Sequence, residues 1–315
     1  MKIWLLLAIA AVAGCAITGS TTKETPREEH FNYTVLFCGN YPHSVRELPS
    51  PLPGNCLEEL SSYIGNSERI SCALYSLDNG IARALEEKEA LVITDSNSKT
   101  NSDMAVKRKS TGLMHNKFCV FDGRVVWTGS FNPTSRNSYD DVIIINSTLL
   151  ANNYLDEFAE LKGNSSSKTT TTKIILNNTL TENYFCPEDG CINILQRKLA
   201  EAESSIYFAA YSFTHPKIAN ELIIKSSEGV EIKGIIEKGG EYSQLPLLKS
   251  NNLAVEDANK RVLHHKFFII DGITVITGSF NPTRNGDERN DENMLIIRDE
   301  EVARVYLDYF KNLPE

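Results

Sequence analysis

The sequence lacks an excess of basic residues: 32 lysines and arginines stand against 41 acidic residues, giving a formal net charge of −9. A general cationic surface that holds nucleic acid or anionic lipid by bulk electrostatics is therefore excluded, and any grip on phosphate must be local. Apolar material is not lacking, because 41% of the 315 residues are hydrophobic and 23% are charged. This composition excludes disorder for most of the chain and suffices for one large or two modest cores.

The amino-terminal apolar run, residues 3–12, is too short to span a bilayer. It follows Lys2 and leads into Val-Ala-Gly-Cys, which ends at Cys15, so residues 1–15 are predicted to be a signal peptide. Those four residues resemble the lipobox of secreted lipoproteins, in which the cysteine is lipidated and becomes the mature amino terminus. An ordinary signal peptide with an incidental cysteine is the alternative. Both interpretations predict export, and the first predicts a membrane anchor through Cys15 on the extracytoplasmic side.

Without the candidate lipid-bearing cysteine, six of the seven cysteines remain, an even number that suits an oxidising compartment. Two pairs are candidate local disulfides: Cys38 with Cys56 around a proline-rich loop, and Cys186 with Cys191 around a short turn. Zinc is the alternative for these pairs, but no second pair at ligand spacing accompanies them, so we predict no metal and no cofactor. Cys72 and Cys119 lie in apolar runs and are expected to be buried small apolar side chains.

An internal repeat organises the rest of the chain. LMHNKFCVFDGRVVWTGSFNPT at residues 113–134 returns as VLHHKFFIIDGITVITGSFNPT at residues 262–283, and similarity extends outward from both blocks. Between the copies lies GNSSSKTTTT, whose small polar residues cannot bury a face. The predicted organisation is a linker at 16–30, a first copy at 31–162, a second linker at 163–172 and a second copy at 173–315.

Within each copy, apolar runs of strand length alternate with apolar residues at helical spacing. This alternation predicts a sheet covered by helices on both faces. Two copies in one chain predict an α/β protein made of two α/β/α sandwich halves, related by a pseudo-twofold axis, with the active site at their interface. Because one chain holds both copies, we expect a monomer.

Each repeated block contains an Asp-Gly pair between apolar runs, the strongest short signal for a β-hairpin. Counting back from a two-residue turn places a histidine opposite a serine in each copy, His115 opposite Ser130 and His264 opposite Ser279. A lysine two residues after each histidine projects from the same side of its strand. The hairpin is therefore expected to gather His, Lys, Ser and Asn around one spot, and pseudo-twofold packing would combine two spots into one site.

This set of residues suits phosphodiester chemistry. A phosphodiester repels nucleophiles by its negative charge, so its non-bridging oxygens need fixed cationic and hydrogen-bonding groups. We assign that role to Lys117, Lys266, Asn132 and Asn281, assisted by Ser130 and Ser279.

The chemistry also needs a nucleophile and a group that protonates the departing oxygen, and imidazole performs either task near neutral pH. His115 and His264 supply one of each. A histidine that must stay oriented usually has a carboxylate on its other nitrogen, and an acidic residue follows each motif at a corresponding place, Asp140 and Glu292.

The pattern HxKxxxxD followed by GSxN, present twice, resembles the paired HKD signatures of the phospholipase D superfamily. The resemblance covers nearly the whole chain after the signal peptide. It implies a phosphohistidine mechanism without metal, in which one histidine attacks phosphorus and the other transfers the proton. By the family's usual order, His115 attacks and His264 transfers the proton. The resemblance makes Asp122 and Asp271 structural members of the signature, consistent with their place in the turns.

The sequence favours a nuclease-type substrate, DNA or RNA, by a small margin. NDEN at residues 290–293 is similar to the compact nuclease branch of the superfamily, although the first copy reads SYDD at 138–141. Basic residues before each motif, at 107–109 and 260–261, either flank an entering polyanion or form a solvated charge run. The acidic total charge and the predicted anchor favour the alternative, a phospholipase D or phosphatidyl-transferase acting on cardiolipin-type membrane phospholipids. A non-catalytic binding module is a third hypothesis.

Overall fold

The computed structural model describes residues 27–29, 32–39, 53–54, 56–100, 102, 104–136, 138–163, 165–176 and 178–313. The predicted signal peptide with Cys15 and much of the predicted linker 16–30 lie outside the described residues. Within the described ranges, no helix has both the length and the apolar character needed to cross a membrane. Lipidation and export therefore stay predictions.

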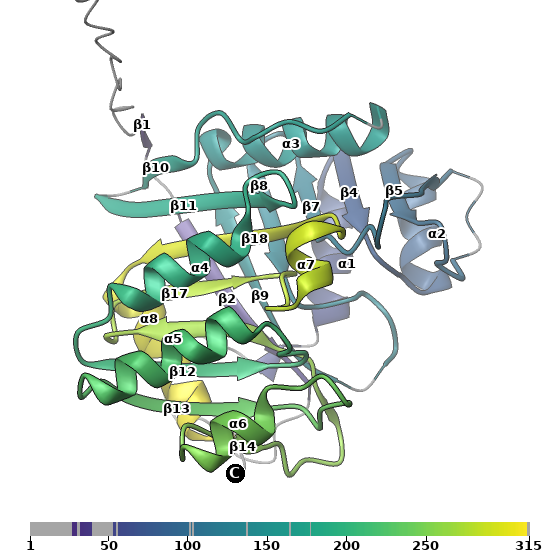
Figure 1. Cartoon of the computed structure of the whole chain (residues 1–315). Coiled ribbons are helices and arrows are strands. Elements are labelled where there is room, and N and C mark those ends of the chain that lie inside the picture. The colour runs from purple at the N-terminus through teal and green to yellow at the C-terminus, as the bar shows by residue number, and fades with distance from the viewer. Residues whose placement is uncertain are drawn as a thin grey trace, which may run out of the picture.

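The first half of the chain forms a mixed sheet, with helices on both faces (Figure 1). Its strands lie in the order β3 (Pro53–Gly54), β2 (Asn32–Cys38), β9 (Ser138–Asn146), β8 (Val125–Gly129), β7 (Lys117–Phe121), β4 (Ile70–Leu74), β5 (Leu91–Asp95) and β6 (Val106–Arg108). Helices α1 (Cys56–Asn66) and α2 (Asn79–Glu87) cover the outer face, and α3 (Thr148–Gly163) covers the inner face. Asp78 caps α2 by accepting hydrogen bonds from two backbone N–H groups of its first turn.

The second half repeats this plan. Its strands lie in the order β1 (Arg27–Glu29), β10 (Lys173–Leu176), β11 (Thr179–Cys186), β18 (Glu292–Arg298), β17 (Thr274–Gly278), β16 (Lys266–Ile270), β12 (Ser205–Ala210), β13 (Glu231–Ile236) and β14 (Ala254–Glu256). The outer face carries α4 (Cys191–Ala200), α5 (Pro216–Ser227) and α6 (Leu245–Ser250), and the inner face carries α8 (Glu300–Lys311). A short helix, α7 (Arg284–Glu288), follows the second motif. Strand β1 lies in the predicted linker 16–30 but pairs with β10, so this stretch is part of the sheet.

The apolar runs of the motif strands follow from burial of both sheet faces, which removes the usual alternation of apolar and polar residues. In β16, Phe267 and Ile269 point into a central core, whereas Phe268 and Ile270 point into an outer core. The central core takes residues from both sheets and from α3 and α8, while each outer core belongs to one half. The two predicted α/β/α halves are confirmed, and they share one core between them.

The motif hairpins differ from the prediction by one residue. In the first hairpin, Phe121 pairs with Val125, so the loop between them holds three residues instead of two. Asp122 and Gly123 take left-handed conformations with φ of 53° and 68°, and Arg124 is the additional residue. The second hairpin has the same register. A shift of one residue changes every cross-strand pair, so the predicted placement of each histidine opposite a serine is wrong.

The disulfides are partly as predicted. Both local disulfides are present, Cys38–Cys56 and Cys186–Cys191. The expectation of unbonded apolar side chains at Cys72 and Cys119 is wrong, because these two residues are buried but form a third disulfide. They are direct partners on the antiparallel strands β4 and β7, with 4.1 Å between their Cα atoms. The two cysteines are 47 residues apart in the chain, and nothing in the sequence indicated that their strands are neighbours.

Candidate active site

Each motif histidine is fastened by its backbone to the opposite half. The N–H of His115 donates to the carbonyl of Asp291 over 2.9 Å, and the N–H of His264 donates to the carbonyl of Tyr139 over 2.8 Å. Two short parallel pairings frame these contacts: Met114 bridges Asp291, and β15 (Val262–Leu263) pairs with β9. The segment before each histidine therefore enters the other half, directly beside that half's acidic residue.

The imidazole side chains also bind to the opposite half. His115 Nδ1 lies 2.8 Å from both carboxylate oxygens of Glu292, and His264 Nδ1 lies 2.6 Å from Asp140 Oδ1. Both carboxyl groups are buried, and although burial alone would raise their pKa, attraction to the histidine and the hydrogen bond from it keep the pKa below its ordinary range. Each ionised carboxylate accepts the Nδ1–H, which leaves Nε2 of each ring for chemistry.

The motif serines support these carboxylates. Ser130 Oγ donates to Asp140 Oδ1 over 2.9 Å, and Ser279 Oγ donates to Glu292 Oε2 over 2.6 Å. Each hydroxyl also accepts a backbone N–H, from Asp141 and Asn293 respectively. A hydroxyl has one hydrogen to donate, and here that hydrogen goes to the carboxylate, so contact of Ser130 and Ser279 with substrate phosphate stays a prediction. Both serines are fully buried and hold the histidine–carboxylate pairs.

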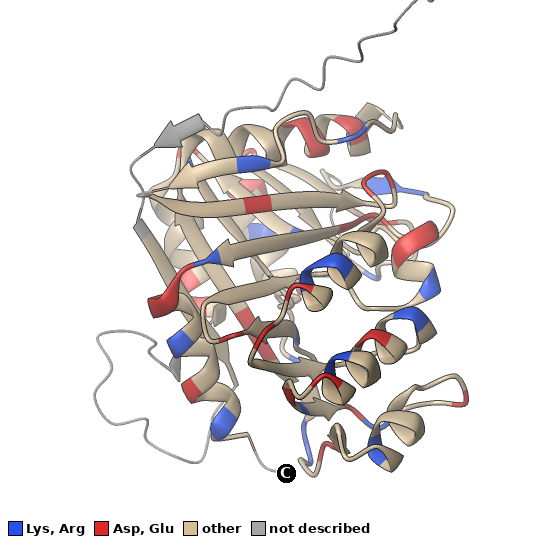
Figure 2. Ribbon diagram, turned by 60° about the vertical axis from the view of Figure 1, so that its left-hand side comes forward, with Lys and Arg blue, Asp and Glu red and all other residues tan. Residues whose placement is uncertain are grey.

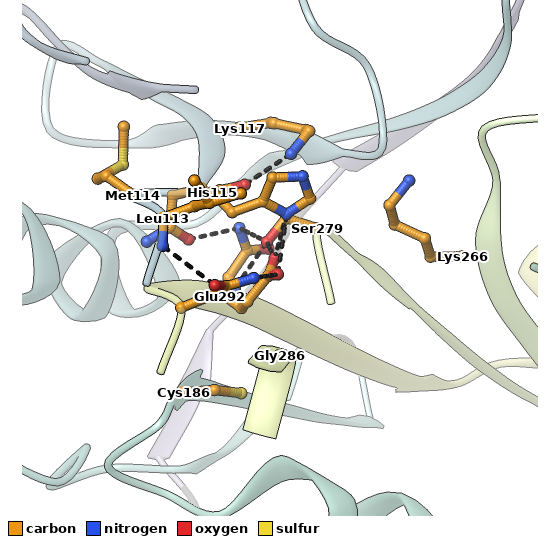
Figure 3. Close-up of polar contacts among 12 residues, drawn as sticks. Leu113, Met114, His115, Lys117, Cys186, Lys266, Ser279, Gly286 and Glu292 are labelled. Carbon is orange, nitrogen blue, oxygen red and sulfur yellow. Dashed lines mark hydrogen bonds and ion pairs between the residues drawn. The ribbon is translucent and has the colours of Figure 1, made fainter. Parts of the chain in front are cut away.

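The two motif lysines provide buried positive charge. Lys117 and Lys266 are 1% and 3% exposed, and each ammonium group donates to the carbonyl of the histidine two residues before it. Burial lowers the pKa of Lys117 to about 7 and that of Lys266 to about 8, and repulsion from Lys266 contributes to the lowering at Lys117. Figure 3 shows the side chains of Lys117 and Lys266 beside the His115 ring, and the charge of each lysine acts on both imidazoles. Both lysines therefore serve one site.

The imidazoles are neutral in the free protein near pH 7. Burial lowers the pKa of both rings, and the nearby ammonium groups lower it further, against the opposing effect of the carboxylates. The pKa of His264 falls to about 4. Lys117 and Lys266 each act on both rings, which means that the two histidines share one electrostatic environment. A neutral imidazole presents a lone pair at Nε2 and can attack or accept a proton.

The motif asparagines follow β8 and β17. Asn132 is half-buried and Asn281 is 7% exposed, and the side-chain oxygen of each is buried without a hydrogen-bond partner among the described residues. Buried polar atoms normally have a hydrogen-bond partner. An amide oxygen without one at the equivalent place in both copies therefore suits a position where a ligand or water supplies the donor.

The motif aspartates lie at the far ends of the hairpins. The carboxylate of Asp122 accepts the backbone N–H groups of Glu68 and Arg69 at 2.9 Å. Asp271 accepts three successive N–H groups at the start of β12, from residues 203–205. Both side chains tie a hairpin turn to the neighbouring strand.

Sequence reasoning missed a tyrosine at each histidine. Tyr75 and Tyr211 follow β4 and β12, and their rings lie 5.1 Å and 4.8 Å, centroid to centroid, from those of His115 and His264. The motif lysine of each half lies over the same ring, at 5.4 Å and 5.3 Å from its centroid. The signal was present in the repeat, because ALYS and AAYS occupy corresponding positions in the two copies.

The predicted basic flanks are only partly available to a substrate. Arg108 forms a largely buried ion pair with Asp291 of the other half at 3.3 Å, and Lys107 donates to backbone carbonyls of its own loop. Lys109 and Lys260 are exposed. Figure 2 shows basic and acidic residues interspersed along the outer helices. This agrees with the expectation that phosphate is bound by a few local groups and not by a general cationic surface.

Comparison with known proteins gives matches in both halves. A family model described as "Cardiolipin synthase, PLD-like domain" matches residues 73–162 and 195–313. The chain is 36% identical over 132 residues to a phospholipase D of Rickettsia conorii, covering 41% of this chain and 66% of that protein. It is 31% identical over 135 residues to a mitochondrial cardiolipin hydrolase of Xenopus tropicalis, covering 41% of this chain and 64% of that protein. The chain thus spans less than two thirds of the length of these relatives.

A solved structure extends the likeness to most of the fold. The phosphatidylserine synthase of Haemophilus influenzae superposes with a TM-score of 0.62, covering 82% of this chain and 83% of that chain. The sequence identity is 13%, so this similarity concerns the arrangement of helices and strands alone.

Proposed function

Because this chain belongs to the phospholipase D superfamily, we propose that it hydrolyses phosphodiester bonds through a covalent phosphohistidine. The observation that carries the proposal is the reciprocal pairing of the site, in which His115 is held by Glu292 and His264 by Asp140. Each histidine is oriented by the other half, so both halves are needed to build either one. This arrangement suits two imidazoles that act on one phosphorus atom.

The first step forms a bond between His115 Nε2 and phosphorus. The bond from phosphorus to the leaving oxygen breaks, and the protonated Nε2 of His264 gives its proton to that oxygen. The entering phosphodiester anion offsets the two ammonium groups that lower the pKa of His264 in the free protein, so substrate binding favours the protonated ring. In the second step neutral His264 takes a proton from water, the resulting hydroxide attacks phosphorus, and the phosphorus–nitrogen bond breaks.

The charged transition state is held by the remaining motif groups. Lys117 and Lys266 each use one N–H on a backbone carbonyl, which leaves further N–H groups for the non-bridging oxygens. The amides of Asn132 and Asn281 would add neutral donors. Because these groups are buried and fixed before substrate arrives, little reorganisation accompanies charge development.

The substrate we favour is a polynucleotide. The pocket next to His264 is lined by hydroxyl groups, by Phe213 and by the charged residues Glu237 and Lys238. This mixed lining suits sugar and base better than acyl chains. Cleavage of membrane phospholipid is the second candidate. It is supported by the similarity to proteins named phospholipase D and mitochondrial cardiolipin hydrolase.

The test uses the purified chain with chelator present, offered single-stranded DNA, RNA, and phosphatidylcholine or cardiolipin vesicles. We expect nucleic acid cleavage, and His115→Asn should lower it by about 10⁴-fold or more. His215→Asn is the matched control, because His215 caps α5 outside the site and asparagine caps helices well. Cleavage of lipid alone would replace the substrate, and loss of activity with chelator would contradict the mechanism. Binding without cleavage of any substrate would favour a non-catalytic module.

We also propose that the chain is an exported lipoprotein anchored through Cys15. The order Lys2, apolar run and Val-Ala-Gly-Cys supports this. Cells expressing the full chain should incorporate labelled palmitate, and Cys15→Ser should abolish the label. A monomer is the expected state, because one chain holds both histidine–carboxylate pairs. Light scattering of the purified chain tests this expectation.

A further inference from the structure

The pocket beside His264 opens between the end of β12 and the loop that follows β13. Its volume is about 280 Å³. Tyr211 forms one wall, the backbone of the glycine pair Gly239-Gly240 forms another, and the pocket continues to Val262, two residues before His264. Hydroxyl groups of Ser212, Thr214 and Ser243 line it as well, and the remaining lining residues are Phe213, Glu237 and Lys238. The Glu237 carboxylate accepts the backbone N–H of Leu263.

Tyr211 connects this pocket to the reacting groups. Its ring lies 4.8 Å from the imidazole of His264 and under the ammonium group of Lys266, and its backbone N–H donates to the carbonyl of His265. The side chain is 38% exposed, whereas His264 is 8% exposed and Lys266 is 3% exposed. A substituent that leaves the site on the His264 side therefore passes over the exposed part of the Tyr211 ring.

The proposed reaction decides which substituent that is. Displacement at phosphorus places the nucleophile and the leaving oxygen on opposite sides, so the leaving group departs toward the proton donor. With His115 as nucleophile, the leaving alcohol lies beside His264, at the mouth of the pocket. The equivalent tyrosine, Tyr75, is beside the nucleophile and therefore on the side away from the leaving group.

We propose that this pocket is a binding subsite for the leaving nucleoside, with its base stacked on Tyr211. The inference rests on the proposed hydrolysis and on His264 as proton donor. A flat ring that is 38% exposed suits a nucleobase, because every base can stack regardless of its hydrogen-bonding edge. The hydroxyl lining suits the sugar and the polar base edges, and the exposed Lys238 at the pocket suits the phosphate that follows in a longer strand. The subsite thus predicts cleavage of single strands with little sequence preference.

The test compares thymidylyl-thymidine with two analogues, in which tetrahydrofuran replaces the nucleoside on either the 5′ or the 3′ side. Product analysis identifies which side is released as the alcohol. For the full-length protein, we expect removal of the base on the released side to lower kcat/KM about 5- to 150-fold, mainly through KM. Removal of the other base should have a smaller effect.

Three variants separate stacking from support of His264. Tyr211→Ala should abolish most of this preference for a base, and Tyr211→Phe should keep it. Tyr75→Ala should leave the preference intact, and Tyr242→Ala is the neutral control because its ring is 76% exposed on the adjacent loop. An equal fall of Tyr211→Ala on all three substrates would assign Tyr211 to positioning His264 and would overturn the subsite. Loss of the preference in Tyr75→Ala would do the same.

The two proposals fail in different ways. Equal cleavage of all three phosphodiesters by the unaltered protein would refute the base subsite and leave hydrolysis intact. Cleavage of cardiolipin vesicles without cleavage of any nucleotide would also refute the nucleoside, again without loss of the phosphodiesterase. Cleavage of none of these compounds would refute the proposed function itself.

Discussion

At the scale of single residues, the pairing of each imidazole with a carboxylate of the other half can be tested by measuring histidine pKa values in solution. Glu292→Gln should lower the pKa of His115, and Asp140→Asn should lower the pKa of His264, because each removes the opposing charge at Nδ1. An opposite charge at this distance changes a pKa by about one to three pH units. NMR titration of the imidazole protons measures both. A larger change at the histidine of the same half would contradict the exchange between halves.

The buried lysines set the alkaline limit of activity. Burial lowers the pKa of Lys117 to about 7 and that of Lys266 to about 8, so their ammonium groups are lost as pH rises through this range. The neutral histidine required as nucleophile is lost only on acidification, because burial lowers the pKa of His115 as well. We expect kcat at saturating substrate, where the bound anion favours protonated His264, to fall above about pH 7–8 as the ammonium groups are lost. A kcat that stays constant to pH 10, near the ordinary lysine pKa, would contradict this expectation.

At the scale of elements, the hairpin explains what sequence could and could not predict. The repeat correctly located the motif strands and their turns, because an Asp-Gly pair between apolar runs is a local signal. The additional loop residue, Arg124 in the first copy, is set by the left-handed pair before it and by the tie between Asp122 and the neighbouring strand. The shift of one residue removes the predicted pairing of Ser130 with His115 across the hairpin, and the hydroxyl of Ser130 supports Asp140.

The hydrogen bonds of the motif aspartates at the hairpin turns are expected to contribute to stability and not to the rate of the reaction. Asp271 accepts three backbone N–H groups, and these hydrogen bonds to a charged group would be lost in Asp271→Ala. The free energy of unfolding should fall by about 1.5–3 kcal/mol, measured by urea denaturation. The kcat of the folded protein should stay close to its original value, because the turn is at the end of the hairpin remote from His264. A large fall in kcat would instead give Asp271 a role in the site.

At the scale of the whole molecule, the exchange between halves had no signal in the sequence. Asp140 and Glu292 follow their own motifs closely, yet each serves the histidine 124 or 177 residues away. Symmetry between copies predicts equivalent positions but cannot tell a contact within a half from a contact across the axis. The tertiary packing of α3 and α8 in one shared core decides it, because it brings the start of β18 beside His115.

Behind the reactive histidines, a second polar network joins the halves and predicts how the molecule unfolds. Asp141 accepts hydrogen bonds from His265, Thr277 and Tyr306, all in the second half and all buried. Burial alone would raise the pKa of Asp141, but these hydrogen bonds hold the pKa below its ordinary value. The stabilisation is therefore present above the unfolded pKa of about 4 and is lost as pH falls through the lower folded value.

Asp141→Ala leaves these donors buried without their acceptor, so the free energy of unfolding at pH 7 should fall by about 3–5 kcal/mol. Glu231→Ala breaks an exposed ion pair with Lys233 and is the matched control, with an expected change below about 1 kcal/mol. Because the network and the central core belong to both halves, calorimetry should show one transition in the original protein, the variant and the control. Two separate transitions in the original protein would mean that the halves fold independently, and a small effect of Asp141→Ala would mean that the network does not join them.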